Sequence, residues 1–256
     1  DLSLARQFHN LARTQLGTVG SGNHYVDRSQ TKRTPSGSAS TLARAASVTG
    51  WRRTSSGWEV APTTSTRHRC CSTLTRRWAR NTSPCMRLAG RCAYAGRDWV
   101  CDKVCRLLGA AIVKEVHNHH NFAWLEEHDG QQLWVVRKGA TPAFPGQRGF
   151  VGGSMGDISV IVEGVDSDEA VQGYRSTVHG AGRVMSRTAA AGRGRGKNRK
   201  KGKISRQMME DWIRDWSVEL RGAGTDESPH CYKRLPDVLV HHEGSIRVQH
   251  TSNPSA

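Results

Sequence analysis

The sequence predicts a mixed α/β fold of the α+β type, in a single domain. Residues 86–108 place apolar side chains near one face at helical spacing. Residues 133–137 and 159–163 are short apolar runs of the length of buried strands, and turn-rich loops lie between them at 145–149 and 152–156. One long helix and separate short strands, without a regular βαβ alternation, favour this class.

The C-terminal part continues the same mixture. Ser205 is a plausible N-cap for a helix through Met208, Met209, Trp212, Ile213 and Trp216. Strands are expected around 218–220 and 246–248. We interpret the Met and Trp stripe as core rather than as a binding platform.

The positive charge is concentrated in two segments. The chain of 256 residues has a formal charge of +16. Residues 28–84 hold 11 Lys/Arg and one acid, and residues 192–203 hold 7 Lys/Arg and no acid, so the remainder is close to neutral. Global basicity therefore says little about function. The 192–203 loop could be a solvated surface or a contact to RNA phosphates.

Several protein classes are excluded or disfavoured by composition. No apolar run reaches the roughly 18–20 residues that a membrane span needs, and the first residues resemble no secretory signal. The chain begins as if cut from a longer one. Its seven cysteines lack the spacing of a disulfide framework. Cys101 and Cys105 are expected to be core-facing thiols on a helix, and free thiols favour the cytoplasm.

The histidines are the first candidates for chemistry. His117, His119 and His120 stand close together with Asn118 and Asn121. On a strand, His117 and His119 would share one face, and neutral imidazoles bind manganese or zinc well. A structural role stays open, because most single histidines are core or surface residues. The letters His-Asn-His alone are weak support for an HNH nuclease.

A second candidate is the segment His179-Gly-Ala-Gly-Arg183. Glycines beside a histidine let backbone N–H groups approach a ligand closely. Arg183 and Arg187 could bind phosphate bidentately. This layout suits an imidazole that attacks a phosphate, although a tight turn with a surface histidine explains the segment equally well by itself.

Three further glycine loops resemble phosphate cradles: residues 20–24, 136–142, and 152–156, the last leading to Ser159. Each is weak alone, but their order along the chain is specific. In that order the blocks resemble the RtcB-type RNA-splicing ligases, over residues 12–27 and about 85–250. The resemblance implies central packed sheets with helices outside.

The resemblance also implies an activity. Such ligases join RNA 3′-phosphate or 2′,3′-cyclic phosphate ends to 5′-hydroxyl ends, using GTP and manganese (Mn2+). His179 would take GMP from GTP, the GMP would pass to the RNA 3′-phosphate, and the 5′-hydroxyl would displace it. By matching motif, His24 and His120 would be metal ligands, and the GMP contacts would be Asn23, Asp27, Ser154, Ser159, Ala181, Gly182 and Tyr232, whose ring would lie against the guanine.

Three blocks of the family pattern are missing. An Asp-x-Gly-Cys-Gly block would precede residue 1, a His-x-Gly-Ser-Arg-Gly block would lie between Asp27 and Met86, and a C-terminal lysine is absent. Residues 28–84 show no period of 2 or 3.6, so composition alone predicts disorder there. We therefore expect three zones: 1–27, a remnant of the ligase domain; 28–84; and 85–256, its main part.

The coding frame offers an explanation for the middle zone. The string C ACT TTG GCT CGC GCG GCT TCG GTC ACC GG encodes residues 41–50. Read one base earlier, it encodes His-Phe-Gly-Ser-Arg-Gly-Phe-Gly-His-Arg, the missing block. We predict out-of-frame translation of about 28–84. Two functions follow: a GTP- and manganese-dependent RNA ligase, or a catalytically inactive remnant with at most non-specific nucleic-acid binding.

Overall fold

A computed structural model describes residues 6, 9–10, 12–14, 16–18, 26–31, 40–44, 71–112, 114–193 and 200–254. Of residues 26–31, 40–44 and 71–85 it gives the backbone only. The chain divides into two compact units. Unit 1 comprises Asp1–Tyr25 and Arg44–Val113, and unit 2 comprises Val26–Ala43 and Lys114–Ala256.

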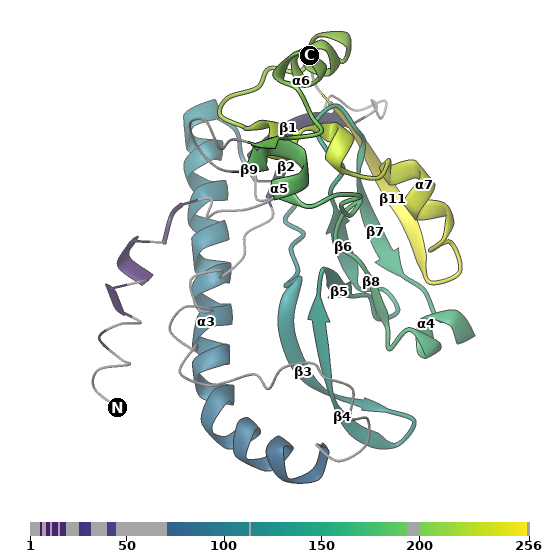
Figure 1. The fold of residues 1–256 in the computed structure, drawn as a ribbon. Coiled ribbons are helices and arrows are strands. Elements are labelled where there is room, and N and C mark those ends of the chain that lie inside the picture. The colour runs from purple at the N-terminus through teal and green to yellow at the C-terminus, as the bar shows by residue number, and fades with distance from the viewer. Residues whose placement is uncertain are drawn as a thin grey trace. The chain divides into compact units, whose positions relative to one another are not determined.

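Unit 1 is dominated by the helix α3, Cys71–Leu108 (Figure 1). The predicted helix over 86–108 is confirmed, and it begins earlier than its apolar spacing indicated. Ala89 and Val100 are buried. Gly17, with φ +76°, lies so close to Trp99 that an added Cβ would stand 3.0 Å from the indole ring. A glycine is therefore needed at this approach.

The main sheet of unit 2 has five strands in the order β2–β1–β11–β7–β6. Their bounds are Val26–Thr31 for β1, Ser40–Arg44 for β2, Arg148–Val151 for β6, Ser159–Gly164 for β7 and Ile246–Pro254 for β11. The pairs β1/β11, β11/β7 and β7/β6 are antiparallel. The strands expected over 159–163 and 246–248 are thus confirmed.

Regular backbone also occurs where composition predicted disorder. β1, β2 and the first turns of α3 lie wholly or partly within residues 28–84. β1 pairs with β11 in a register that sets Ser29 opposite Pro254. Backbone pairing of this kind needs no alternation of apolar side chains, so the absence of a period was a poor guide. The out-of-frame origin of the segment stays a prediction.

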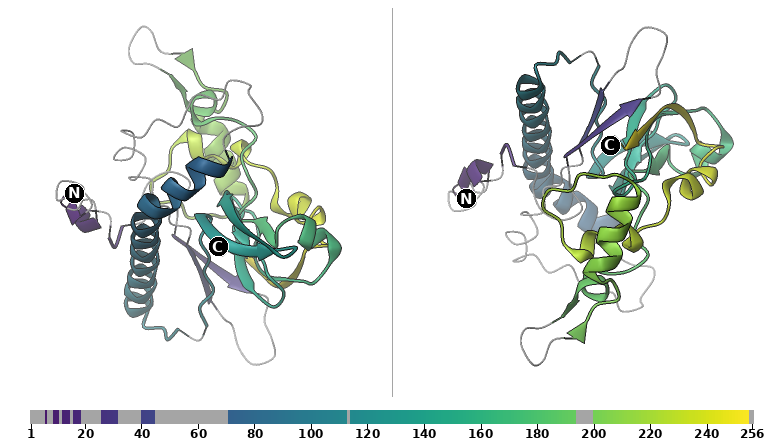
Figure 2. Two further views of the ribbon diagram at one scale, coloured as in Figure 1. Left: turned by 90° about the horizontal axis from the view of Figure 1, so that it is seen from below. Right: turned by 90° about the horizontal axis from the view of Figure 1, so that it is seen from above.

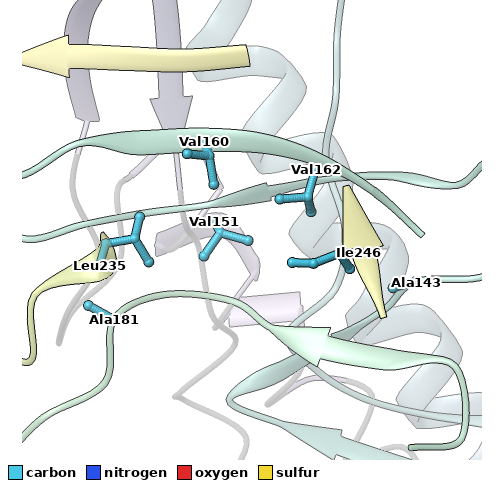
Figure 3. Packing of buried hydrophobic residues seen from close by; sticks show 7 residues of the cluster. All are labelled: Ala143, Val151, Val160, Val162, Ala181, Leu235 and Ile246. Atoms are coloured by element: carbon cyan, nitrogen blue, oxygen red, sulfur yellow. The ribbon is translucent and has the colours of Figure 1, made fainter. Parts of the chain in front are cut away.

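The core of unit 2 lies against this sheet and draws on distant parts of the chain. Figure 3 shows its buried members: Ala143, Val151, Val160, Val162, Ala181, Leu235 and Ile246. Leu235 opens the helix α7, Leu235–Val240, which packs Val238 and Leu239 onto the same cluster. Because Ala181 belongs to this core, its burial holds the glycine segment around it against the sheet.

A hairpin of β3, Asn121–His128, and β4, Gln131–Lys138, forms a separate two-stranded sheet. Its turn residues Asp129 and Gly130 both have positive φ, the signature of a tight hairpin turn. The strand expected over 133–137 is therefore present. This strand is only partly buried, and the side chain of Val136 is 69% exposed. A two-stranded sheet leaves one of its faces open to solvent.

Short elements complete unit 2: β5, Ala140–Pro142, which pairs with β8, Ser176–Val178; the helices α4, Asp168–Gln172, and α5, Arg187–Ala191; and the 3-10 turns η2, Thr225–Glu227, and η3, Pro229–Cys231. β9, Gly192–Arg193, pairs with β10, Lys200–Lys201. Figure 2 shows this basic hairpin standing out from the five-stranded sheet.

The helix predicted near the C-terminus is α6, Arg206–Asp215, and Ser205 caps it by accepting a 3.1 Å hydrogen bond from the Met208 N–H. Met209 is buried, but Met208 and Trp216 are 40% and 45% exposed. The Met and Trp stripe is therefore only partly core. The strand expected around 218–220 is wrong, because the Val218 N–H donates to Ile213 O and closes the helix.

The α+β class is confirmed, since helices and antiparallel sheets are both present. In the described part of the chain, no helix combines the length and apolar character needed to cross a lipid bilayer.

Candidate active site

Two histidines from distant segments lie side by side in unit 2. His179 follows β8 directly, and His120 immediately precedes β3. Their ring centroids are 4.8 Å apart, with the planes tilted by 47°. Both side chains are half-buried. The structure thus brings together the predicted nucleophile and one predicted metal ligand.

The expected strand alternation of the histidine cluster is wrong. Residues 114–120 form no strand, and β3 begins at Asn121. His119 stacks instead on Phe122, with ring centroids 4.8 Å apart. Asn118 donates through Nδ2 to the Arg148 carbonyl at 3.1 Å, which ties this irregular stretch to β6.

Two of the predicted glycine loops are hydrogen-bonded to each other. The Gly152 N–H donates to His179 O at 3.3 Å, and the Ala181 N–H donates to Gly152 O at 3.1 Å. A Cβ on Gly180 would stand 3.1 Å from Gly152 O. The 152–156 loop and the His179 segment therefore form one unit, whose close contact depends on glycine.

The 152–156 loop also has a fixed conformation of its own. A Cβ on Gly153 would overlap the carbonyl oxygen of Ile158. The Gly153 N–H donates to Ser159 Oγ at 3.3 Å. Ser154 Oγ is buried and has no hydrogen-bond partner within the described residues. Since buried hydroxyls are normally bonded, this oxygen is suited to meet a ligand.

Asp157 supports this loop, and the sequence reasoning missed it. Its carboxylate accepts from the Ile158 and Leu235 N–H groups at 2.9 and 2.8 Å, and Arg234 lies 3.3 Å away. Leu235 is 78 positions further along the chain. An acidic residue after a glycine was the only local signal, and it does not reveal such a partner.

Tyr232 lies at the other end of the His179 segment. Arg183 donates to the Tyr232 hydroxyl at 2.6 Å and its guanidinium carbon lies 4.7 Å from the ring centre. The hydroxyl donates to Glu227. Burial, and then the Glu227 carboxylate, raise the pKa of Tyr232 well above its ordinary value, so the phenol stays neutral.

The expected phosphate-binding arginines are largely occupied. Arg183 donates through its three nitrogens to Met185 O, the Tyr232 hydroxyl and Asp226 O. Arg187 forms ion pairs with Asp226 and Glu227. Each nitrogen of Arg183 therefore already donates one hydrogen bond within the protein, and the binding of phosphate by Arg183 and Arg187 stays a prediction. Arg187 remains 41% exposed in its side chain.

Gly182 offers an open surface in the same segment. Its φ is +78°, and a Cβ there would meet nothing within 4 Å. Its carbonyl accepts from the Lys233 N–H at 2.9 Å. The glycine therefore serves a left-handed turn with an exposed backbone, rather than a tight packing contact.

The third glycine loop, residues 136–142, is built differently, and its binding of phosphate stays a prediction. It forms the end of β4 and the strand β5, and Arg137 is 2% exposed in an ion pair with Glu126. The remaining predicted site residues are less well placed. Asn23 and His24 lie outside the described residues, and Asp27 lies in β1 with only its backbone described.

Comparison with known proteins supplies the family. The family described as tRNA-splicing ligase RtcB matches residues 54–255. The RNA-splicing ligase RtcB of Escherichia coli K12 is 36% identical over 155 residues, which cover 59% of this chain and 34% of the relative.

Archaeal relatives agree with this match. The tRNA-splicing ligase RtcB of Thermococcus kodakarensis is 35% identical over 145 residues, covering 50% of this chain and 29% of the relative. That of Archaeoglobus fulgidus is 35% identical over 163 residues, covering 55% and 31%. The chain spans about a third of the length of these curated relatives. It belongs to the tRNA-splicing ligase RtcB family.

Proposed function

We propose that this protein is an RNA ligase that joins RNA 3′-phosphate or 2′,3′-cyclic phosphate ends to 5′-hydroxyl ends through a histidine–GMP intermediate on His179. The observation that carries the proposal is the His179 ring beside the His120 ring, 4.8 Å between centroids, within two hydrogen-bonded glycine loops. An imidazole beside a second imidazole and near the exposed Gly182 suits attack on a phosphate.

In the first step an imidazole nitrogen of His179 attacks the α-phosphorus of GTP. A P–N bond forms, the bond to the β-phosphate oxygen breaks, and pyrophosphate leaves. An oxygen of the RNA 3′-phosphate then attacks that phosphorus and displaces His179. Finally the RNA 5′-hydroxyl attacks the 3′-phosphate, gives up its proton, and releases GMP. A cyclic phosphate would first be opened by water.

Of the two histidines assigned to the metal, His120 lies beside His179, and His24 lies outside the described residues. His24 and His120 would hold manganese, which when bound neutralises charge on the reacting phosphates. The nucleotide contacts would be Asn23, Asp27, Ser154, Ser159, Ala181, Gly182 and Tyr232. The buried Ser154 hydroxyl and the open backbone at Gly182 support this assignment. Guanine would use the Tyr232 face opposite Arg183. We place the activity in the cytoplasm, where free thiols persist.

A second candidate is a catalytically inactive remnant that binds nucleic acid non-specifically. The exposed cations of the β9–β10 hairpin, Arg193, Lys200 and Lys201, favour it. Such side chains bind phosphates without reading sequence.

Incubation with α-labelled GTP and manganese separates the two. The unchanged chain should acquire label that mild acid releases and alkali preserves, as expected for a P–N bond. His179→Ala should acquire none. His250→Ala, an exposed histidine on β11, is the matched control and should be labelled normally. Equal labelling of His179→Ala, or none on the unchanged chain, would overturn the ligase proposal.

A further inference from the structure

A buried arginine outside the glycine loops reaches the strand that leads to His179. Arg137, at the end of β4, is 2% exposed. Its two terminal nitrogens donate to the Glu126 carboxylate on β3, at 2.6 and 2.9 Å. His128 Nε2 lies 3.0 Å from the same carboxylate. This cluster therefore closes the β3–β4 hairpin with a bidentate ion pair.

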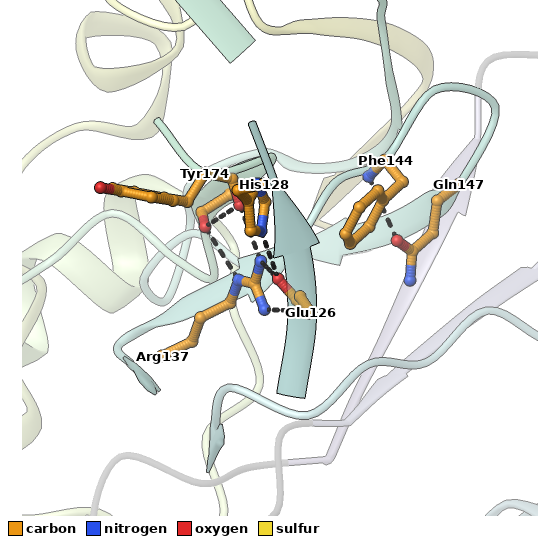
Figure 4. A network of polar contacts seen from close by, with 7 residues as sticks. Glu126, His128, Arg137, Phe144, Gln147 and Tyr174 are labelled. Atoms are coloured by element: carbon orange, nitrogen blue, oxygen red, sulfur yellow. Dashed lines mark hydrogen bonds and ion pairs between the residues drawn. The ribbon is translucent and has the colours of Figure 1, made fainter. Parts of the chain in front are cut away.

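The same guanidinium makes two contacts beyond the hairpin (Figure 4). Its Nε donates to Ser176 Oγ at 2.8 Å, and its Nη2 donates to Tyr174 O at 2.8 Å. Ser176 Oγ in turn donates to Tyr174 O at 3.0 Å. One side chain thus clamps both the hydroxyl and the backbone of residues 174–176.

The clamped residues lie at a strained position. Tyr174 and Arg175 have φ of +51° and +49°, in the left-handed region that side chains other than glycine rarely adopt. They follow α4 and turn the chain into β8, which has three residues and pairs with β5. His179 is the next residue. The Tyr174 and Arg175 N–H groups donate to Val171 O and Ala170 O of α4, and contacts from other elements add to these bonds in holding the turn.

We propose that Arg137 is a positioning residue for His179. It fixes the turn at 174–176, and thereby the direction of β8 and the orientation of the His179 imidazole that follows this strand. The proposal rests on the proposed function, since positioning matters for an attacking group. Small errors in the placement of a nucleophile lower reaction rates strongly.

Hydrogen–deuterium exchange of the full chain, without nucleotide or metal, tests the positioning directly. Arg137→Met should raise exchange at residues 174–181 at least about tenfold, while β7 stays protected. Arg148→Met is the matched control, because Arg148 pairs with Glu163 on neighbouring strands but is largely exposed. It should leave 174–181 unchanged. Unchanged exchange in Arg137→Met would overturn the proposal.

A second variant covers the possibility that Arg137→Met folds poorly. The double variant Glu126→Gln, Arg137→Met removes the unpaired buried carboxylate together with the guanidinium. It should regain cooperative unfolding but keep the fast exchange at 174–181. Protection restored there would show that the charge balance, rather than the clamp, holds the turn, and would overturn the proposal.

The labelling reaction gives the catalytic readout. In Arg137→Met the rate of GMP transfer at saturating GTP should fall about 10- to 100-fold, with the half-saturating GTP concentration changed less than about threefold. Arg137→Lys should regain stability through its charge but not this rate, because ammonium cannot make the forked contacts. A rate that simply tracks stability overturns the positioning role. No label on the unchanged chain would contradict the ligase proposal alone, because the exchange result stands apart from it.

Discussion

Residues 136–142 and 179–183 look alike in sequence and differ in what they do. Each carries an arginine near a glycine with φ +78°, and a Cβ at Gly139 or Gly182 would meet nothing within 4 Å. In the first segment Arg137 is buried against Glu126 and Thr141 is 2% exposed. In the second, His179 stands beside His120 and the backbone at Gly182 is exposed.

The difference teaches that glycine beside arginine marks a backbone turn and a charge, but is not by itself evidence of a phosphate site. What matters is where the N–H groups of the arginine go. Arg137 donates its N–H groups to the hairpin and to the turn before β8. Arg183, too, donates hydrogen bonds to neighbouring protein groups: Met185 O, the Tyr232 hydroxyl and Asp226 O. What distinguishes the second segment is its imidazole beside His120 and its exposed backbone at Gly182.

The largest effect should come from residues 136–142, which we call the framework segment, when the ion pair of Arg137 with Glu126 is broken. Arg137→Met leaves the buried Glu126 carboxylate with His128 but without its arginine. Removing one member of a buried pair costs about 3–5 kcal/mol. Arg148→Met, which breaks an ion pair with Glu163 whose side chains are 40% and 26% exposed, should cost about 0–1 kcal/mol. Urea unfolding measures both free energies. Similar losses for the two variants would show that Arg137 is no more structural than a surface arginine.

The two glycines offer a closely matched test of the comparison. Gly139→Ala and Gly182→Ala force the same left-handed φ on a residue with a side chain, so each should cost about 1–2 kcal/mol in unfolding free energy. Only Gly182→Ala should also slow GMP labelling, by about tenfold, because a methyl group obstructs the exposed backbone there. Labelling rates of the two variants, normalised to the amount of folded protein, test whether only Gly182→Ala slows the reaction. Equal slowing by both substitutions would mean that strain alone is being measured.

Local patterns account for much of the fold. The spacing of apolar residues in 86–108, the run 159–163 and the cap at Ser205 each report on a stretch of a few turns, and each was predicted. β1 and β2 lie mostly in the stretch where composition predicted disorder, because their sequences carry no alternation of apolar residues. The strand expected around 218–220 is wrong for another reason, since the Val218 N–H is still hydrogen-bonded to Ile213 O of α6.

The site was predicted less completely, for a physical reason. The motif order suggested that His120 and His179 act together, and their rings are neighbours. The supporting contacts join residues far apart in sequence, such as Asp157 with Leu235. The two partners lie in different elements, so no period or spacing connects them. Sequence motifs therefore pointed to two histidines that lie together, but not to the residues that support them.

A smaller effect should appear in the acid stability of the framework segment. Burial alone would raise the pKa of Glu126, but hydrogen bonds from Arg137 and His128 and their charge hold it below its ordinary value of 4.5. A carboxylate with a lowered pKa stabilises the fold fully above that ordinary value, and the contribution is lost as pH falls below it. Glu126→Gln should therefore be less stable near neutral pH, with a difference that shrinks below pH 4.5. Unfolding curves at several pH values measure it, and a constant difference would contradict the assignment.

The smallest effect should come from a third basic, glycine-bearing segment, the β9–β10 hairpin. Unlike Arg137 and Arg183, Lys200 and Lys201 are exposed. If they contact RNA phosphates, replacing both with Gln should weaken binding of single-stranded RNA severalfold and lower the salt dependence, with the slope of log K against log salt falling by roughly 1.4. Replacing Arg148 and Arg221, which pair with Glu163 and Glu219, removes equal charge and should change the slope far less. Filter binding at several salt concentrations distinguishes the pairs. If both double substitutions lower the slope equally, RNA binding depends on net charge rather than on the hairpin. The exposure of cations would then be as poor a guide to function as a glycine beside an arginine.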